Sequence, residues 1–227
     1  MLSIIIPALD EEAAIAACLG RVQAARAAGA EVIVVDGGSR DRTRDLAAPL
    51  ADLVLDSPRG RAAQMNAGAR VSRGETLLFL HADTLLPEGA HRLVEEDLAA
   101  SGREWGRFDV TITGEAWLLR VVAALMNRRS RWTGIATGDQ ALFVRRSAFT
   151  ACGGFPAIAL LEDVELSTRL KRRGPPLCLR EKVITSGRRW EKRGVLRTIV
   201  LMWRTRLAYA LGADPERLAR RYDGRPA

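Results

Sequence analysis

The first 80 residues alternate short apolar runs with helix-like segments, and this alternation constrains the fold more than any other feature of the sequence. Residues 11–28 and 61–71 are rich in alanine and predict helices. Strands joined by crossovers of a dozen or more residues form parallel βαβ units. The sequence therefore predicts an α/β fold with a mixed, mainly parallel central sheet flanked by helices. The four apolar runs that carry this prediction read LSIIIP, EVIVVD, DLVLD and ETLLFL.

After Gly102 the pattern becomes less regular. We expect strands at residues 106–113, 139–146 and 176–181, and helices at residues 88–100, 115–129, 157–174 and 195–211. Neither an internal repeat nor a low-complexity linker divides the chain, so we expect a single domain over residues 1–227. Its first half, residues 1–100, has the pattern of a nucleotide-binding α/β unit.

Charge is distributed unevenly along the chain. Residues 1–100 contain 10 Lys and Arg against 15 Asp and Glu, whereas the remainder contains 25 against 12, within a total of +8. A basic second half attracts anions such as nucleotide diphosphates, nucleic acid or acidic lipid headgroups, and it is equally typical of an arginine-rich solvated surface. We expect no nucleic-acid partner, because the sequence contains no recognisable nucleic-acid motif or aromatic platform.

The N-terminal segment, the apolar runs and the cysteines bear on the cellular compartment of the protein. The N-terminal segment MLSIIIPALDEE has no basic leader, and no apolar run approaches the roughly 20 residues that span a bilayer. Cys18, Cys152 and Cys178 are odd in number and widely separated, which indicates neither a disulfide framework nor a zinc site. We therefore expect a cytoplasmic protein, with peripheral attachment to the inner face of the membrane left open.

Carboxylates follow three of the predicted strands, where a parallel sheet collects its ligands. They are Glu11, Asp36 and Asp83. A carboxylate at such a position can accept hydrogen bonds from a ribose or a base, or hold a divalent cation under a diphosphate. Asp36 can also simply cap the turn DGGSRDRT, because Asp favours turns. No glycine-rich dinucleotide loop follows the first strand, and no Gly-Lys-Ser/Thr phosphate loop occurs.

Eight motifs occur in order over nearly the whole chain: IIIPALDEEAAI, VVDGGSRDRT, GRAAQMNAGA, FLHADTLLP, WGRFDV, TGIATGDQALFVRR, LLEDVELSTRLKRRG and SGRRWEKRGVLRT. Together they resemble the motifs of the family 2 glycosyltransferases with the GT-A fold. The closest resemblance is to the small bacterial transferases described as radical-SAM/selenodomain-associated. The resemblance implies an inverting transferase that moves a sugar from a nucleotide-diphosphate donor to an acceptor hydroxyl. It also implies that residues 101–227 form the acceptor and catalytic half.

The resemblance implies a donor site along the sheet edge. Asp83 corresponds to the last Asp of the family's Asp-x-Asp motif and would hold Mn²⁺ or Mg²⁺. His81 departs from that motif; it either ligates the metal or only forms a hydrogen bond. The residues implied to bind the donor nucleotide are Pro7, Glu11, Asp36, Arg61, Asn66, His81 and Asp83.

The resemblance also implies a general base. Asp163, in the pair Glu162-Asp163, corresponds to the carboxylate that accepts the acceptor hydroxyl's proton. Taken alone, the pair is equally typical of a helix N-terminus, where the helix dipole favours carboxylates. Five further residues are implied to face the diphosphate or the acceptor, or else form a tight turn and a basic loop: Asp139, Gln140, Arg188, Arg189 and Trp190.

Residues 195–211 predict an amphipathic helix with apolar side chains at helical spacing and arginines on other faces. Such a helix packs on its own domain, contacts a second copy in a homodimer, or lies on an anionic membrane and brings a lipid-linked acceptor to the site. Its apolar residues are Leu196, Ile199, Val200, Trp203, Leu207 and Leu211.

Two other functions remain open from the sequence. A sugar-1-phosphate nucleotidyltransferase has a similar α/β core, although the missing glycine-rich loop argues against it. A non-catalytic module that binds anions or nucleic acid would use the basic half, but it would leave Asp36, Asp83 and Asp163 without a role.

Overall fold

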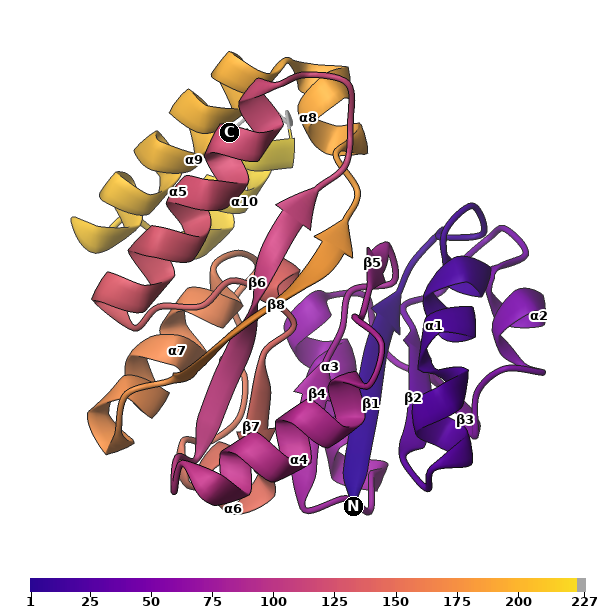
Figure 1. Cartoon of the computed structure of the whole chain (residues 1–227). Helices are drawn as coiled ribbons and strands as arrows, with labels where there is room; N and C mark the ends of the chain where they lie inside the picture. Colours follow the sequence, from indigo (N-terminus) through magenta and orange to yellow (C-terminus); the bar gives the residue numbers. More distant parts are fainter. Residues whose placement is uncertain (224–227) are drawn as a thin grey trace.

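An eight-stranded mixed sheet lies at the centre of the protein in a computed structural model that describes residues 1–223, apart from the side chains of Arg189 and Asp223 (Figure 1). In spatial order the strands are β3 (Leu53–Asp56), β2 (Glu31–Asp36), β1 (Leu2–Ala8), β4 (Thr76–Phe79), β7 (Phe143–Arg145), β6 (Trp105–Ile112), β8 (Leu177–Thr185) and β5 (Thr84–Leu85). The α/β class predicted from the sequence is confirmed.

Helices cover both faces of this sheet (Figure 1). One apolar core packs α1 and α4 of the first half and α5 of the second half against the sheet, and another packs α3, α6 and α7 against the opposite face. The helices are α1 (Ile15–Ala27), α2 (Thr43–Ala47), α3 (Arg61–Val71), α4 (Ala90–Ala100), α5 (Leu118–Thr133), α6 (Arg146–Ala151), α7 (Glu162–Arg173), α8 (Arg188–Arg193), α9 (Val195–Ala210) and α10 (Pro215–Asp223), with a 3₁₀ turn η1 (Gly138–Gln140).

The parallel half follows the predicted pattern. β1 pairs in parallel with β2 on one side and β4 on the other, and β2 pairs in parallel with β3. Every residue of β1, β2 and β4 is buried, which explains why these strands read as continuous apolar runs. The predicted helix at residues 11–28 begins later, at Ile15, because the backbone first turns after β1.

The second half supplies the antiparallel pairs. β7 runs antiparallel to both β4 and β6, and β5 runs antiparallel to β8. The predicted helix at residues 157–174 starts only at Glu162, and the predicted strand at 139–146 is shortened by η1. The short elements α2, β5, α6 and α8 had no predicted counterpart, since elements of two to six residues leave too little periodicity to detect. The nine-residue helix α10 was not predicted either.

Both halves contribute strands to one sheet, while the single-domain boundary over residues 1–227 stays a prediction. Within residues 1–223, none of the helices has the length and apolar content needed to cross a bilayer.

A buried carboxylate joins the base of β1 to β2. Glu31 Oε2 accepts hydrogen bonds from Ser3 Oγ at 2.7 Å and from the Arg73 backbone N–H at 2.8 Å, and Oε1 accepts one from Arg73 Nε at 2.9 Å. Burial works against ionisation, but these hydrogen bonds prevail and lower the pKa of Glu31 below its ordinary value. Glu31 therefore stabilises the fold mainly when it is ionised.

We predict that Glu31→Gln lowers the free energy of unfolding by about 1–2 kcal/mol at neutral pH, because an amide replaces a carboxylate that accepts three hydrogen bonds. Since the folded-state pKa is lowered, this stabilisation is present above the ordinary pKa of Glu and is lost as the pH falls through the folded-state value. Urea unfolding measured from pH 7 down to about pH 3 tests this. The exposed Glu96→Gln on α4 is the control, and an equal loss at all pH values would contradict the assignment.

Candidate functional site

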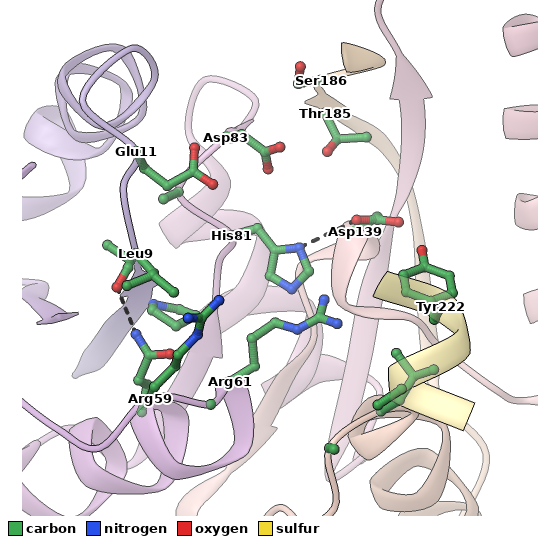
Figure 2. Close-up of a pocket in the computed structure, with 18 of the residues that line it drawn as sticks. Leu9, Glu11, Arg59, Arg61, His81, Asp83, Asp139, Thr185, Ser186 and Tyr222 are labelled. Atoms are coloured by element: carbon green, nitrogen blue, oxygen red, sulfur yellow. Dashed lines mark hydrogen bonds and ion pairs between the residues drawn. The ribbon is translucent and has the colours of Figure 1, made fainter. Parts of the chain in front are cut away.

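A cavity of about 340 Å³ opens where β1 and β4 end (Figure 2). Pro7 and Ala8 line it from the end of β1, His81 and Asp83 from the segment after β4, and Arg61 from the start of α3. The carboxyl ends of parallel strands place these groups together, as expected from the sequence. The remaining wall includes residues of η1, the end of β8, the loop before α7, and helices α8, α9 and α10.

Two carboxylates share one arginine at the mouth of the cavity. Arg188 Nη2, at the start of α8, lies 2.9 Å from Glu11 Oε2 and 3.8 Å from Asp83 Oδ2. Burial raises the pKa of Glu11, although the hydrogen bond from Arg188 opposes that rise. Figure 2 shows the carboxylates of Glu11 and Asp83 on the same side of the cavity. The cavity mouth is therefore acidic, and a cation already balances part of its charge.

His81 lies between the halves of the site. Its Nδ1 is 3.3 Å from Asp139 Oδ1 of η1, and this contact appears as a dashed line in Figure 2. Burial disfavours the imidazolium, but the hydrogen bond to Asp139 and the charge of that residue raise the pKa of His81. Gly138 packs directly against the ring, where a Cβ atom would overlap it. The imidazole is thus held toward the second half of the chain.

Glu162 and Asp163 line an adjoining cavity of about 80 Å³. Asp163 Oδ2 accepts the Gly138 N–H at 2.7 Å, and Glu162 Oε1 lies 3.2 Å from Arg61 Nε. Burial raises the pKa of Glu162, Arg61 opposes the rise, and the negative charge of Asp163 adds to it. Both cavities are lined by Arg61, His81, Asp139, Leu160, Met202 and Tyr222, so they lie side by side.

Backbone strain concentrates at this site. Among the described residues, three non-glycine residues have positive φ: Asp10 at 53°, Ala141 at 46° and Leu161 at 67°. Each is directly adjacent to a predicted site residue, namely Glu11, Gln140 and Glu162. Such conformations cost of order 1–3 kcal/mol each and persist where the surrounding structure fixes them, often at functional sites.

Three of the predicted site residues are engaged outside the cavities. Asp36 is buried, and its carboxylate accepts the N–H groups of Gly38 and Ser39 at 3.0 Å, as a turn-capping residue does. Asn66 bonds both the N–H and the carbonyl of Phe155, which fixes the loop before α7. Gln140 is buried and caps η1 through Thr137. Their predicted contacts with the donor or acceptor remain predictions.

Trp190 is buried and lines the main cavity, whereas the side chain of Arg189, a predicted site residue, lies outside the described residues. The sequence reasoning did not single out Arg59, Gln64 or Tyr222, which also line the cavity. Gln64 donates to the carbonyls of Ala8 and Val35 at 2.8 Å. Arg59 stands just before α3 and could have been noticed as a cation at a helix start; Tyr222 lies far along the chain and gave no signal.

The residues at the cavity mouth fit a divalent cation that is shared with a ligand. Among the described residues, no three His, Cys, Asp or Glu side chains cluster closely enough to hold a metal alone. Asp83 and Glu11 offer hard carboxylate oxygens, and Mg²⁺ typically takes one or two protein carboxylates with substrate phosphates as its further ligands. His81 directs Nδ1 to Asp139, so its observed role is a hydrogen bond.

The sequence matches the family model "Glycosyl transferase family 2" over residues 3–149, more than half of the chain. The chain belongs to glycosyl transferase family 2. Solved structures share its GT-A fold. A mannosyltransferase from Pyrobaculum calidifontis in complex with GDP-Man and Mn²⁺ superposes with a TM-score of 0.66 and 22% identity, over 91% of this chain and 60% of that one. S. aureus TarS 1–349 in complex with UDP-GlcNAc gives 0.63 and 17%, over 82% and 58%.

The curated relatives of this family 2 protein are longer than it is. An undecaprenyl-phosphate 4-deoxy-4-formamido-L-arabinose transferase from Pseudomonas paraeruginosa is 32% identical over 162 residues, which are 64% of this chain and 46% of the relative. A PGL/p-HBAD biosynthesis glycosyltransferase from Mycobacterium bovis is 39% identical over 95 residues, 39% of this chain and 37% of the relative. The chain thus spans less than half the length of these two relatives.

We predict that Gly138→Ala displaces the His81 ring and lowers stability by about 1–3 kcal/mol, because a methyl group has no room there. The chain contains only two histidines, so NMR spectra of the imidazoles report the ring directly. The His81 resonances should shift while those of His91 stay in place. Gly174→Ala, which meets no atom within 4 Å, is the control and should leave both unchanged.

Proposed function

We propose that this protein is an inverting glycosyltransferase that moves a sugar from a nucleotide-diphosphate donor to a hydroxyl of its acceptor. The observation that carries the proposal is the adjacency of two cavities with shared walls, one with Asp83 and Glu11 and the other with Asp163. A donor diphosphate near Asp83 would direct its sugar toward Asp163. The order of motifs further supports placing the chain in the small bacterial radical-SAM/selenodomain-associated group.

The donor side is supported by chemistry and by structural neighbours. The backbone of Pro7, the end of β1 and the guanidinium groups of Arg59 and Arg61 line the cavity that would receive the nucleotide diphosphate. The titles of two structural neighbours name GDP-Man with Mn²⁺ and UDP-GlcNAc. We propose a donor of the same chemical class for this protein.

Asp83 would hold Mn²⁺ or Mg²⁺, with Glu11 next to it. When bound, the metal would neutralise the charge that the leaving diphosphate gains. Arg188, which contacts Glu11 and Asp83 through one nitrogen, is placed to turn its guanidinium onto the same diphosphate oxygens. Its contact with the two carboxylates would then be replaced by contacts with the donor.

Asp163 would act as general base. As the acceptor oxygen forms its bond to the anomeric carbon, the bond from that carbon to the diphosphate breaks, and Asp163 accepts the acceptor's proton. The Gly138 N–H fixes Asp163 Oδ2 in place. Glu162 is paired with Arg61 and would orient the start of α7. A single displacement of this kind inverts the anomeric centre.

The relatives also bear on the acceptor. One curated relative is named for undecaprenyl phosphate, which supports an acceptor carried on a lipid for this protein. The helix at residues 195–211 has two proposed roles. In membrane contact its apolar side chains are covered by lipid, and in a homodimer they are covered by a second copy of the chain.

Thermal unfolding with a panel of UDP-, GDP-, CMP-, ADP- and dTDP-sugars, each with and without Mn²⁺ or Mg²⁺, tests the proposal. A ligand at about 100 times its dissociation constant stabilises the folded state by roughly 2.7 kcal/mol, which raises the Tm of a chain of this size by several degrees. A metal-dependent shift confined to one base supports the proposal and identifies the nucleotide. No shift with any member of the panel, at millimolar concentration, would count against it.

We predict that Asp163→Asn retains the donor-induced Tm shift and reduces sugar transfer by about 10²–10⁴-fold, the range typical of a lost general base. The amide keeps the shape of the side chain but cannot accept the proton. Asp45→Asn, at an exposed position on α2, is the matched control and should transfer at the wild-type rate. Wild-type transfer by Asp163→Asn would refute the assigned base.

We predict that Asp83→Ala abolishes the metal-dependent part of donor binding, because it removes the carboxylate at the end of the β4 segment. Isothermal titration of the donor with and without Mn²⁺ should show at least a tenfold weaker donor affinity only in the presence of metal. Asp45→Ala serves as the control. Unchanged metal dependence in Asp83→Ala would place the metal elsewhere.

A further inference from the structure

An apolar groove of about 780 Å³ opens between α5 and α9, next to the candidate active site. Figure 1 shows these two helices side by side, at the end of the molecule remote from β3. Leu125, Met126 and Trp132 of α5 face Ile199 and Trp203 of α9 across it. Trp132 is 77% exposed and Trp203 is 74% exposed, so neither belongs to the core.

The outer face of α9 extends this apolar surface. Its exposed side chains recur at intervals of three or four residues, which places them on one side of the helix. They are Leu196, Val200, Trp203 and Leu207, followed by Leu211 just after the helix. Of the six apolar residues that the sequence placed on this stripe, Ile199 alone packs partly against the core. Packing within the domain, one of the three uses that the sequence left open, is therefore wrong for most of the stripe.

The charges on the two helices distinguish between the two remaining alternatives, a homodimer contact and an anionic membrane. Together α5 and α9 contain seven arginines and no acidic residue, and of these arginines Arg131 is paired with Asp109 of β6. A second copy related by two-fold symmetry would place like charges opposite one another on this face, which is unfavourable. An anionic lipid surface complements the same arginines, and tryptophan is enriched at the headgroup level of bilayers.

The groove also connects to the reaction site. Met202 lines the groove, the donor cavity and the cavity around Asp163, and Arg206 lines the groove and the Asp163 cavity. Among the described residues, the side chain of Arg206 has no hydrogen bond or ion pair. Two buried nitrogens of Arg129, Nε and Nη2, have no hydrogen-bond partner, and the nearby charge that partly balances this guanidinium is that of Asp163. An anion at the inner end of the groove would satisfy these cationic groups.

We propose that the α5–α9 face docks on an anionic lipid bilayer and that the groove receives the apolar chain of one lipid, whose anionic head lies at Arg206 and Arg129 beside Asp163. This inference rests on the proposed function and names its acceptor class: an amphiphile with an anionic head and an apolar chain. In that position the acceptor reaches the base from the membrane side, and the donor occupies the cavity at the ends of β1 and β4.

Co-sedimentation with vesicles tests the docking face without donor or catalysis. One set of vesicles consists of phosphatidylcholine alone, and the other contains phosphatidylcholine with phosphatidylglycerol. We expect binding to the anionic vesicles that weakens as salt rises, because the arginines supply the attraction. Equal binding to both sets, or to neither, would overturn the proposal.

Matched variants locate the face. Trp203→Ser should weaken vesicle binding about tenfold or more, since a large apolar side chain no longer enters the lipid. Its control, Leu53→Ser on the edge strand β3, also removes an exposed apolar side chain and should bind like wild type. Arg206→Gln should weaken binding to anionic vesicles about fivefold, whereas Arg92→Gln on α4 should not. Wild-type binding by both Trp203→Ser and Arg206→Gln would exclude this face.

Two further measurements separate the competing outcomes. Analytical ultracentrifugation without lipid detects a dimer. If the wild type is a dimer that the Trp203→Ser substitution dissociates, and if the wild type does not bind vesicles, the face belongs to a second copy of the chain and the proposal is overturned. Donor-induced Tm shifts on Trp203→Ser test the proposed function independently, because Trp203 does not line the donor cavity. If the wild type binds anionic vesicles but neither the wild type nor Trp203→Ser shows a donor-induced Tm shift, the proposed transferase is refuted and the lipid-binding face stands.

Discussion

The arrangement of the site depends on the two-sided pairing of β4. This short strand pairs in parallel with β1 through Leu77 and Leu78, and antiparallel with β7 through the same two residues. The parallel pairing brings the end of β4 beside the end of β1, so that Asp83 and Glu11 face one cavity. The antiparallel pairing brings the residues before β7 to the same edge of the sheet, and η1 therefore presents Asp139 to His81. The boundary where the parallel strands β1 and β4 meet the antiparallel strand β7 is thus also the junction between the two parts of the site, and beyond it β6 and β8 pair in parallel again.

Polar contacts then fix the elements that this junction brings together. The Gly138 N–H bonds Asp163, which ties η1 to the first turn of α7, and Arg61 bonds Glu162, which ties α3 to the same turn. The side chain of Asn127 bonds both the N–H and the carbonyl of Val110, which attaches α5 to β6. Because α5 is held in this way, one wall of the apolar groove has a fixed position relative to the base.

The sequence predicted the parts of the fold whose residues follow a single period. The buried strands of the first half and the helix at Arg61–Val71 appear where the pattern placed them. The start of α7 did not, because Leu161 takes a left-handed conformation that no periodicity reveals. In the site, strand-end carboxylates marked Glu11 and Asp83, but the same argument marked Asp36, whose carboxylate is engaged by its own turn. Tyr222 lines the cavity only because α10 folds back to it, and tertiary contacts of that kind leave no local signal.

The charges at the cavity mouth explain why a donor would come with a metal. Two carboxylates, Glu11 and Asp83, already lie there, and burial together with the negative charge of Asp83 raises the pKa of Glu11. A nucleotide diphosphate alone would add about two negative charges beside them, with Arg188 as the nearby cation that contacts both carboxylates. A divalent cation bound with the diphosphate restores the balance and leaves Arg188 able to bond phosphate oxygens. The balance of charge differs at the α5–α9 face, where seven arginines on helices that contain no acidic residue favour an anion that arrives without a metal, although Arg131 is already paired with Asp109. The two substrates would thus reach Asp163 through environments of opposite charge, which keeps the donor and the acceptor in separate cavities until they meet.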